Sequence, residues 1–147
     1  MVRPPALANT FYSGDPSALM REVDAQLSEG MRLAAAQLPV QSAYPKILVV
    51  PHAGHVYSGL AASVGYARIA PYIAQIKRIV MLCPAHREYF TGVALPDVLA
   101  FATPLGTMTV DALGIAAVSG LPFVGNYAKA HEQEHALEVH LPFLQRL

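Results

Sequence analysis

The chain has 147 residues, which suits one domain. Its ten Lys and Arg balance ten Asp and Glu, so it has no net charge to attract nucleic acid or an anionic membrane, and we expect neither partner. Charged residues make up only 14% and apolar residues 54%, so we expect apolar surface that is covered either by a second copy or within a larger domain.

The expected compartment follows from what the sequence lacks. No apolar run approaches the ~18 residues that a membrane helix needs. The first residues, MVRPPALANT, have no long hydrophobic signal core. Cys83 is the only cysteine, so no internal disulfide can form. Together these features predict a cytoplasmic protein with a single domain over residues 1–147.

The first predicted element is a helix that begins near residue 15. Asp15 can cap the free amides of the first turn, and Pro16 suits the first helical position. Leu19, Val23 and Leu27 recur every four residues and give the helix one apolar face. The stretch 39–45 is expected to be a loop.

Two short apolar runs, at 46–50 and 78–83, predict buried strands. A helix is expected between them, over about 59–70. The order strand, helix, strand indicates a βαβ unit with parallel strands. The sequence therefore predicts an α/β fold with a largely parallel central sheet.

The remaining elements are shorter. A third strand is expected at 97–101, followed by a turn at 103–106 and a short helix at 111–119. Residues 130–147 are expected to be partly helical, with an interruption at Pro142.

Histidines directly follow both predicted strands, at His52 and His86. Ligands of open α/β sheets bind beyond the carboxyl ends of the strands, and imidazole is the commonest metal ligand near neutral pH. We expect both rings to share one metal site; the competing interpretation is two unrelated polar residues at strand ends. His55, in the turn after His52, either contacts the substrate or orients a metal ligand, or it is a solvated loop residue.

The segment from His131 to His135 matches both H-E-x-x-H and the reversed H-x-x-E-H. On a helix, its two imidazoles would share one face, which is the basis of a zinc metalloprotease hypothesis. The longer protease motif needs Gly and His where Glu138 and Leu141 stand, so this hypothesis ranks low. Glu134 and Glu138 belong either to a solvated helix face or to the surroundings of His135, as carboxylates that orient its ring.

Tyr57 and Ser58 open the helix that follows the first histidine turn. Free amides at a helix start favour an anionic ligand, whereas an ordinary Ser N-cap is the plainer interpretation. Cys83 precedes His86 by three residues, and we expect it to be a small buried hydrophobe rather than a ligand.

Several segments taken together resemble the Memo family, also called the AmmeMemoRadiSam system protein B family. They occur in the family's order and span nearly the whole chain. The matching segments are RPPALANTFY at 3–12, PHAGHVYSG at 51–59, CPAH at 83–86, TPLG at 103–106 and EHALEVHLPFL at 134–144.

The resemblance implies a three-layer α/β/α fold related to the class III extradiol dioxygenases, which use non-haem iron. It implies that His52 and His86 bind a divalent metal, with iron first and zinc or copper as alternatives. It also implies that His135 acts as an acid or base. The departures are His55, where the family usually has an aromatic residue, and Cys83 to His86, where it usually reads G-P-S-H.

Length is the largest departure. Family members are nearly twice as long, so we expect the chain to correspond to about their N-terminal half. The family's third metal ligand, a cysteine, would then lie beyond residue 147, and the fold and the site would be incomplete. We therefore expect weak metal binding and a homo-oligomer that buries residues from 130–147.

Two kinds of function remain in view. The first is a Memo-like metal-binding protein of the dioxygenase-like superfamily, which would be an oxidoreductase if it is an enzyme. The second is a non-catalytic module that uses the same place to hold a small molecule, a peptide or an anion. Consumption of a catechol-like substrate under oxygen separates the two.

Overall fold

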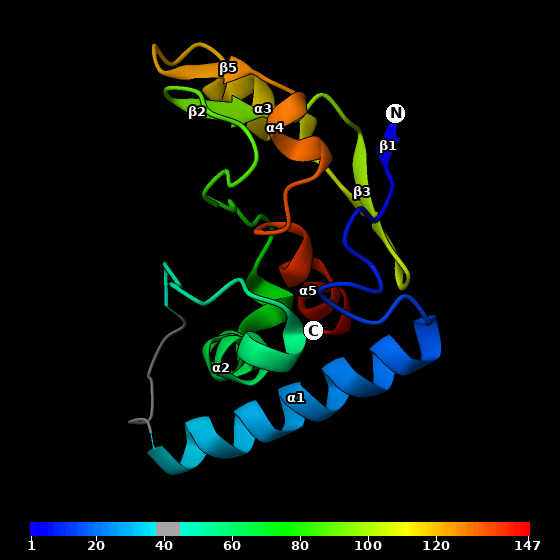
Figure 1. Cartoon of the computed structure of the whole chain (residues 1–147). Helices are drawn as coiled ribbons and strands as arrows, with labels where there is room; N and C mark the ends of the chain where they lie inside the picture. Colours follow the sequence, from blue (N-terminus) through cyan, green and yellow to red (C-terminus); the bar gives the residue numbers. More distant parts are fainter. Residues whose placement is uncertain (38–44) are drawn as a thin grey trace.

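The computed structural model describes residues 1–37 and 45–147, and it shows a mixed α/β fold (Figure 1), as predicted. None of the helices in these residues has the length and apolar character needed to cross a membrane. The loop predicted at 39–45 falls almost wholly outside the described residues. The elements are β1 (Val2–Arg3), α1 (Pro16–Gln37), α2 (His55–Ala67), η1 (Ala70–Gln75), β2 (Val93–Leu95), β3 (Ala100–Thr103), β4 (Gly106–Thr109), α3 (Ala112–Val118), β5 (Val124–Asn126), α4 (Lys129–Glu132), η2 (Glu138–His140) and α5 (Leu141–Arg146).

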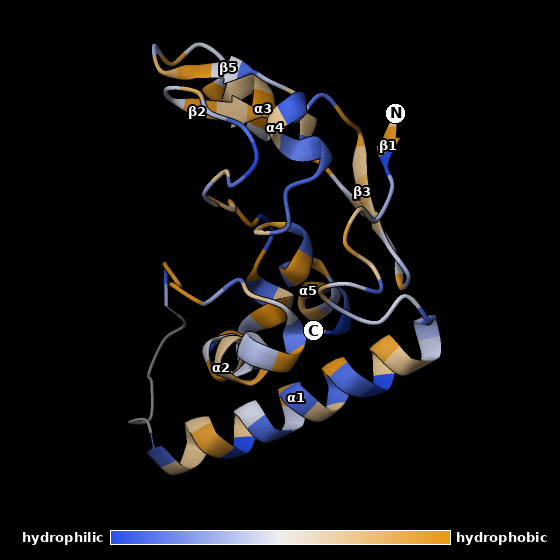
Figure 2. Ribbon diagram, in the orientation of Figure 1, coloured by the Kyte–Doolittle hydropathy of each residue, from blue (hydrophilic) through white to orange (hydrophobic). Residues whose placement is uncertain are grey.

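Helix α1 forms as the sequence predicts. The Ala18 amide donates to Asp15 Oδ1 at 2.7 Å, which caps the helix. The side chains that recur every four residues, Leu19, Val23 and Leu27, are all buried. At Gly30, a Cβ atom would meet the Ser63 carbonyl carbon at 2.6 Å. The absence of a side chain there lets α1 pack closely against α2, and this helix pair forms one side of the core (Figure 2).

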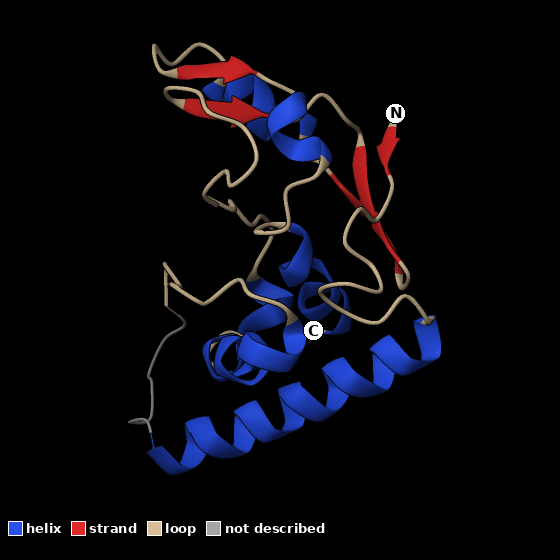
Figure 3. Ribbon diagram, viewed as in Figure 1, coloured by secondary structure: helices blue, strands red, loops and turns tan. Residues whose placement is uncertain are grey.

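The strands form two small sheets (Figure 3). In the first, β1 pairs in parallel with β3, and β3 pairs antiparallel with β4. The turn between β3 and β4 ends at Gly106, whose φ of +124° lies in a region that favours glycine. In the second sheet, β2 pairs in parallel with β5. The strand predicted at 97–101 is present as β3, a few residues later.

The prediction of strands at 46–50 and 78–83 is wrong. Neither segment is a strand in the described part of the chain. Several of their apolar side chains face solvent, with Val49 95% and Leu82 80% exposed, whereas Leu48 and Val50 pack partly buried against the core. A strand needs a neighbour that satisfies its backbone groups, and the described residues pair their strands elsewhere. The predicted βαβ unit is therefore not formed, and two small sheets take the place of one central parallel sheet.

The predicted helices are present with shifted ends. Helix α2 begins at His55 rather than near residue 59. Helix α3 follows Asp111, whose side chain accepts from the Gly114 amide, close to the predicted range of 111–119. Pro142 lies in the first turn of α5, where it is compatible with the helix.

The C-terminal residues are buried within the chain itself. Helix α5 packs against α1, and Phe143 is only 1% exposed. Arg146 also pairs with Asp24 of α1, with 2.7 Å between Nε and Oδ1. The prediction that residues 130–147 supply an apolar face for a second copy is therefore wrong, because these residues pack within the chain. The large exposed apolar side chains include instead Ile47, Val49, Val80 and Leu82.

Candidate metal centre

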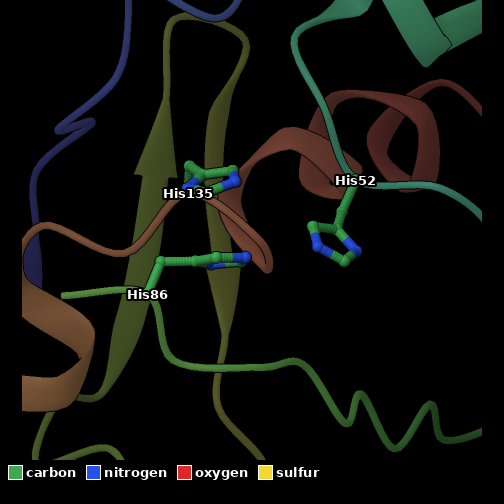
Figure 4. Close-up of side chains that lie close together, drawn as sticks. All are labelled: His52, His86 and His135. Atoms are coloured by element: carbon green, nitrogen blue, oxygen red, sulfur yellow. The ribbon is translucent and has the colours of Figure 1, made fainter. Parts of the chain in front are cut away.

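Three histidines from three separate loops meet in space. His52 lies in the loop before α2, His86 in the loop before β2, and His135 between α4 and η2. Each offers one ring nitrogen, and these three nitrogens all lie within 4.8 Å of one another. The backbone segments that carry them approach from different directions (Figure 4). The structure thus brings together the three histidines that the sequence analysis selected.

The rings of His86 and His135 are the closer pair. Their centroids are 4.4 Å apart and their planes are inclined by 30°. The His52 ring stands 5.4 Å from that of His86 and 5.9 Å from that of His135. Figure 4 shows His86 and His135 one above the other, with His52 facing them.

This spacing fits a shared metal ion after a small adjustment. Two imidazole nitrogens bound to one ion at ~2.0–2.1 Å each are separated by at most ~4.2 Å. No two of the three nitrogens in the cluster are more than 4.8 Å apart. A movement of about a few tenths of an ångström by each nitrogen closes that difference, which lies within the reach of ordinary side-chain rotation.

Glu134 lies between two of the loops. Its Oε1 accepts from His86 Nδ1, at 2.9 Å, and from the backbone amides of His135 and Ala136. Its Oε2 accepts from the His86 amide at 2.5 Å. Burial alone would raise the pKa of Glu134, but these hydrogen bonds outweigh burial and lower it to about 2. The carboxylate is therefore ionised at neutral pH.

His135 is held in a partly apolar setting. Its ring lies 4.5 Å from that of Phe11, measured between centroids, and its side chain is 14% exposed. Burial lowers the pKa of His135 despite the nearby Glu134 carboxylate, and His86 and His52 add to that effect. At neutral pH the ring is neutral, which is the state that binds metals.

His55 takes neither of its two predicted roles. It is 2% exposed, so it is not a solvated loop residue, and its Nε2 donates to the Val139 carbonyl at 2.8 Å. Its ring packs against those of Tyr12 and Phe143 in the core. Burial lowers the pKa of His55. The structure therefore makes it a core residue of α2.

The start of α2 differs from the sequence prediction. The N-cap is Gly54, and Ser58 lies inside the first turns. The Ser58 hydroxyl donates to the Ala53 carbonyl at 3.0 Å, which uses its only proton. Tyr57 is 87% exposed. The Ser N-cap interpretation is therefore wrong, and the role of Tyr57 and Ser58 in binding a ligand stays a prediction.

The sequence suggested that Glu138 could orient His135, but in the structure it does not. It is fully buried, and its carboxylate accepts from Arg3 Nη1 at 2.5 Å and from the Leu7 amide at 2.9 Å. The Tyr12 hydroxyl and the Ala6 amide also donate to it. Glu138 therefore fastens the N-terminal segment to η2.

The backbone at 131–135 does not form the continuous helix that the metalloprotease motif requires. Helix α4 ends at Glu132, so His131 and His135 do not share a helical face. The His131 Nε2 donates to the Ala94 carbonyl at 3.0 Å, and His131 is outside the histidine cluster. The local sequence was misleading because the chain turns at Gln133 instead of continuing the helix.

The sequence analysis missed two residues that support the histidine cluster, Phe11 and Arg3. Phe11 carried no signal, because an apolar residue near a predicted turn looks like any core residue. Arg3 reaches the carbonyls of His131 and Glu134, at 2.5 and 2.9 Å, and so supports the loop that carries His135. A lone arginine near the N-terminus gives no sequence pattern that would place it there.

Comparison with known proteins identifies the family. Residues 3–147 match the family model described as Memo-like protein. MEMO1 family proteins from Methanothermobacter thermautotrophicus and Aquifex aeolicus are 35% and 34% identical to this chain, and each alignment covers 99% of it. The alignments cover 52% and 50% of those relatives, so the chain spans about half the length of the curated relatives it matches. The chain belongs to the Memo-like family.

Proposed function

We propose that this chain binds a divalent metal ion through His52, His86 and His135. The observation that carries the proposal is the convergence of three ring nitrogens within 4.8 Å, from loops far apart in sequence. Iron is the first candidate, with zinc and copper as alternatives, because imidazole suits all three. Three protein ligands would leave further coordination positions open for an oxygen ligand.

We further propose a relationship to the dioxygenase-like superfamily, with an oxidoreductase of the extradiol type as the activity to test. A bound iron would supply redox chemistry and polarise an oxygen ligand. The chain itself would hold and orient the ligands: Glu134 fixes His86, and Phe11 covers the ring of His135.

Two alternative roles are proposed for His135. As a third ligand it would add to the affinity for the metal. As a general acid or base, it would move a proton beside an ion that His52 and His86 hold. Its neutral ring, favoured by burial, is compatible with both roles.

The test begins with metal analysis of protein purified without an affinity tag. Titration with Fe(II) under anaerobic conditions should show one ion bound per chain, and loss of His52 or His86 should abolish it. Turnover of a catechol-like substrate under oxygen would support the enzyme. A chain that binds such a substrate without consuming it would be the binding module instead. A chain that takes up none of the three metals would contradict the metal site.

Two further properties belong to the proposal. We propose a cytoplasmic protein and a homo-oligomer that uses the exposed apolar segments at 46–50 and 78–83. The motivation is that Ile47, Val49, Val80 and Leu82 are all largely exposed. Exposed apolar surface of this kind favours association with further protein.

A further inference from the structure

We propose that Glu134 is a positioning residue that fixes His86 as an Nε2 ligand. The inference rests on the proposed metal site, and it adds which nitrogen of His86 faces the ion and which group determines this. Glu134 acts through the two histidine loops and does not itself belong to the cluster of three rings.

The tautomer of His86 follows from its partner. Glu134 Oε1 already accepts from the amides of His135 and Ala136, so it is an acceptor, and its 2.9 Å contact with His86 Nδ1 places the proton on Nδ1. In the neutral ring, the lone pair is then on Nε2. A neutral imidazole binds a metal through its unprotonated nitrogen, so His86 is prepared to bind through Nε2.

The same carboxylate also sets the distance between the two loops. Glu134 Oε2 accepts from the His86 amide at 2.5 Å, across 48 residues of chain. Its Oε1 accepts from the amides of His135 and Ala136, both at 2.9 Å, and lies 3.2 Å from His135 Nδ1. One buried side chain thus holds the backbones of both His86 and His135, whose rings form the close pair.

These contacts explain why Glu134 is not itself a ligand. Both of its oxygens already accept hydrogen bonds from the chain, and the residue is only 6% exposed. Binding an ion directly would leave buried amides without acceptors, which is costly. His52 differs from His86, because its ring makes no hydrogen bond in the described residues. His52 is therefore free to rotate toward an ion that the other two rings position.

The first measurement needs neither a metal nor a variant. In metal-free protein labelled with ¹⁵N-histidine, at mildly alkaline pH, two-bond ¹H–¹⁵N spectra report which nitrogen of each ring carries the proton. We expect His86 to be protonated on Nδ1, with its signals assigned by their loss in His86→Gln. A His86 ring protonated on Nε2 would overturn the inference.

The second measurement compares Glu134→Gln with Glu132→Gln. The Gln amide places a donor where the carboxylate had only acceptors, so one of the N–H groups around it loses its partner. Glu132 is exposed and belongs to the same sequence motif, which makes it the matched control. We expect Glu134→Gln to weaken zinc binding by about 10- to 100-fold and to shift the His86 ring toward the Nε2–H tautomer, and Glu132→Gln to do neither.

The outcomes separate this inference from the metal proposal. Folded Glu134→Gln protein with wild-type zinc affinity and an unchanged His86 tautomer would overturn the positioning role. If Glu134→Gln does not fold, the tautomer of the unmodified chain decides. A chain with His86 protonated on Nδ1 that binds no zinc, iron or copper would contradict the metal proposal, while the carboxylate would still set the tautomer.

Discussion

Arg3 and Glu138, which are 135 residues apart in the chain, form a buried ion pair with 2.5 Å between Nη1 and Oε2. Removing one partner of such a pair leaves a buried charge without compensation, which typically costs ~3–5 kcal/mol. We therefore expect Glu138→Gln to lower the free energy of unfolding by an amount of that order. Urea unfolding followed by circular dichroism measures it.

The surface pair of Arg32 and Glu29 provides the control. Their side chains are 64% and 40% exposed, so solvent weakens the attraction. Glu29→Gln should leave the urea midpoint nearly unchanged. Equal midpoint shifts for the buried and the exposed variant would show that the Arg3–Glu138 pair does not stabilise the fold as described.

We expect substitutions of His131 and His135 to have different effects on metal binding. His135 belongs to the cluster, whereas His131 donates to the Ala94 carbonyl outside it. We expect His135→Ala to weaken zinc binding by at least about tenfold and His131→Ala to change it little. Isothermal titration of both variants measures this. Equal losses would favour the metalloprotease motif, in which both histidines bind the ion.

Stability should fall as the pH is lowered from about 6.5 to 4. Burial, with help from the charges of His52 and His55, lowers the pKa of His140 from 6.5 to about 4. The unfolded chain takes up a proton on His140 near pH 6.5, but the folded chain does so only near pH 4. Above this window His140 is neutral in both states, and within it the unfolded state binds more protons and is favoured.

The contribution of His140 to this pH dependence can be measured separately from those of other histidines. For His140 alone the linkage amounts to at most ~3.4 kcal/mol across the window. Burial also lowers the pKa values of His55 and His131, so they contribute in the same direction. His140→Gln should therefore flatten the pH dependence of the unfolding free energy without abolishing it. An unchanged slope in the variant would show that His140 takes up its proton at the same pH in the folded and the unfolded chain.

The cap of α1 supports a smaller prediction. Asp15→Ala removes the acceptor for the Ala18 amide and should cost ~1 kcal/mol, whereas Asp15→Asn keeps an acceptor and should cost less. Thermal unfolding of the two variants orders them. If the alanine variant is as stable as the asparagine variant, the cap makes no net contribution.

The exposed apolar segments lead to a prediction about assembly. Light scattering at micromolar concentration should give a mass above 15.7 kDa that depends on concentration. The double substitution Val49→Lys and Leu82→Lys places charge on two largely exposed positions and should shift the chain toward the monomer. A constant monomer mass for the unmodified chain would contradict a homo-oligomer.

Local features of the sequence predicted local features of the fold. The cap at Asp15 and the four-residue spacing from Leu19 to Leu27 lie within one helix, so the sequence contained all the needed information. The segments 46–50 and 78–83 show the opposite case. Their composition favours strands, but a strand also depends on a neighbour, and composition does not reveal whether one is available.

Two of the candidate histidines were selected because they follow predicted strands, and the described part of the structure has no strands there. His52, His86 and His135 lie together, although the strands that were expected to position the first two are not formed. Glu134 and Glu138 were not distinguished, because both lie near His135 in sequence. Only the three-dimensional path shows that Glu134 contacts His86 while Glu138 contacts Arg3.

The binding of the N-terminal segment by residues 131–138 has a consequence for synthesis. As the chain leaves the ribosome, Arg3 emerges 128 residues or more before its partners at His131, Glu134 and Glu138. Until then the arginine and the amides of Ala6 and Leu7 remain hydrated. We expect a nascent chain that holds His52 and His86 but not yet His135 to capture metal weakly. Complete ligation would then wait until residues 131–138 contact the N-terminal segment.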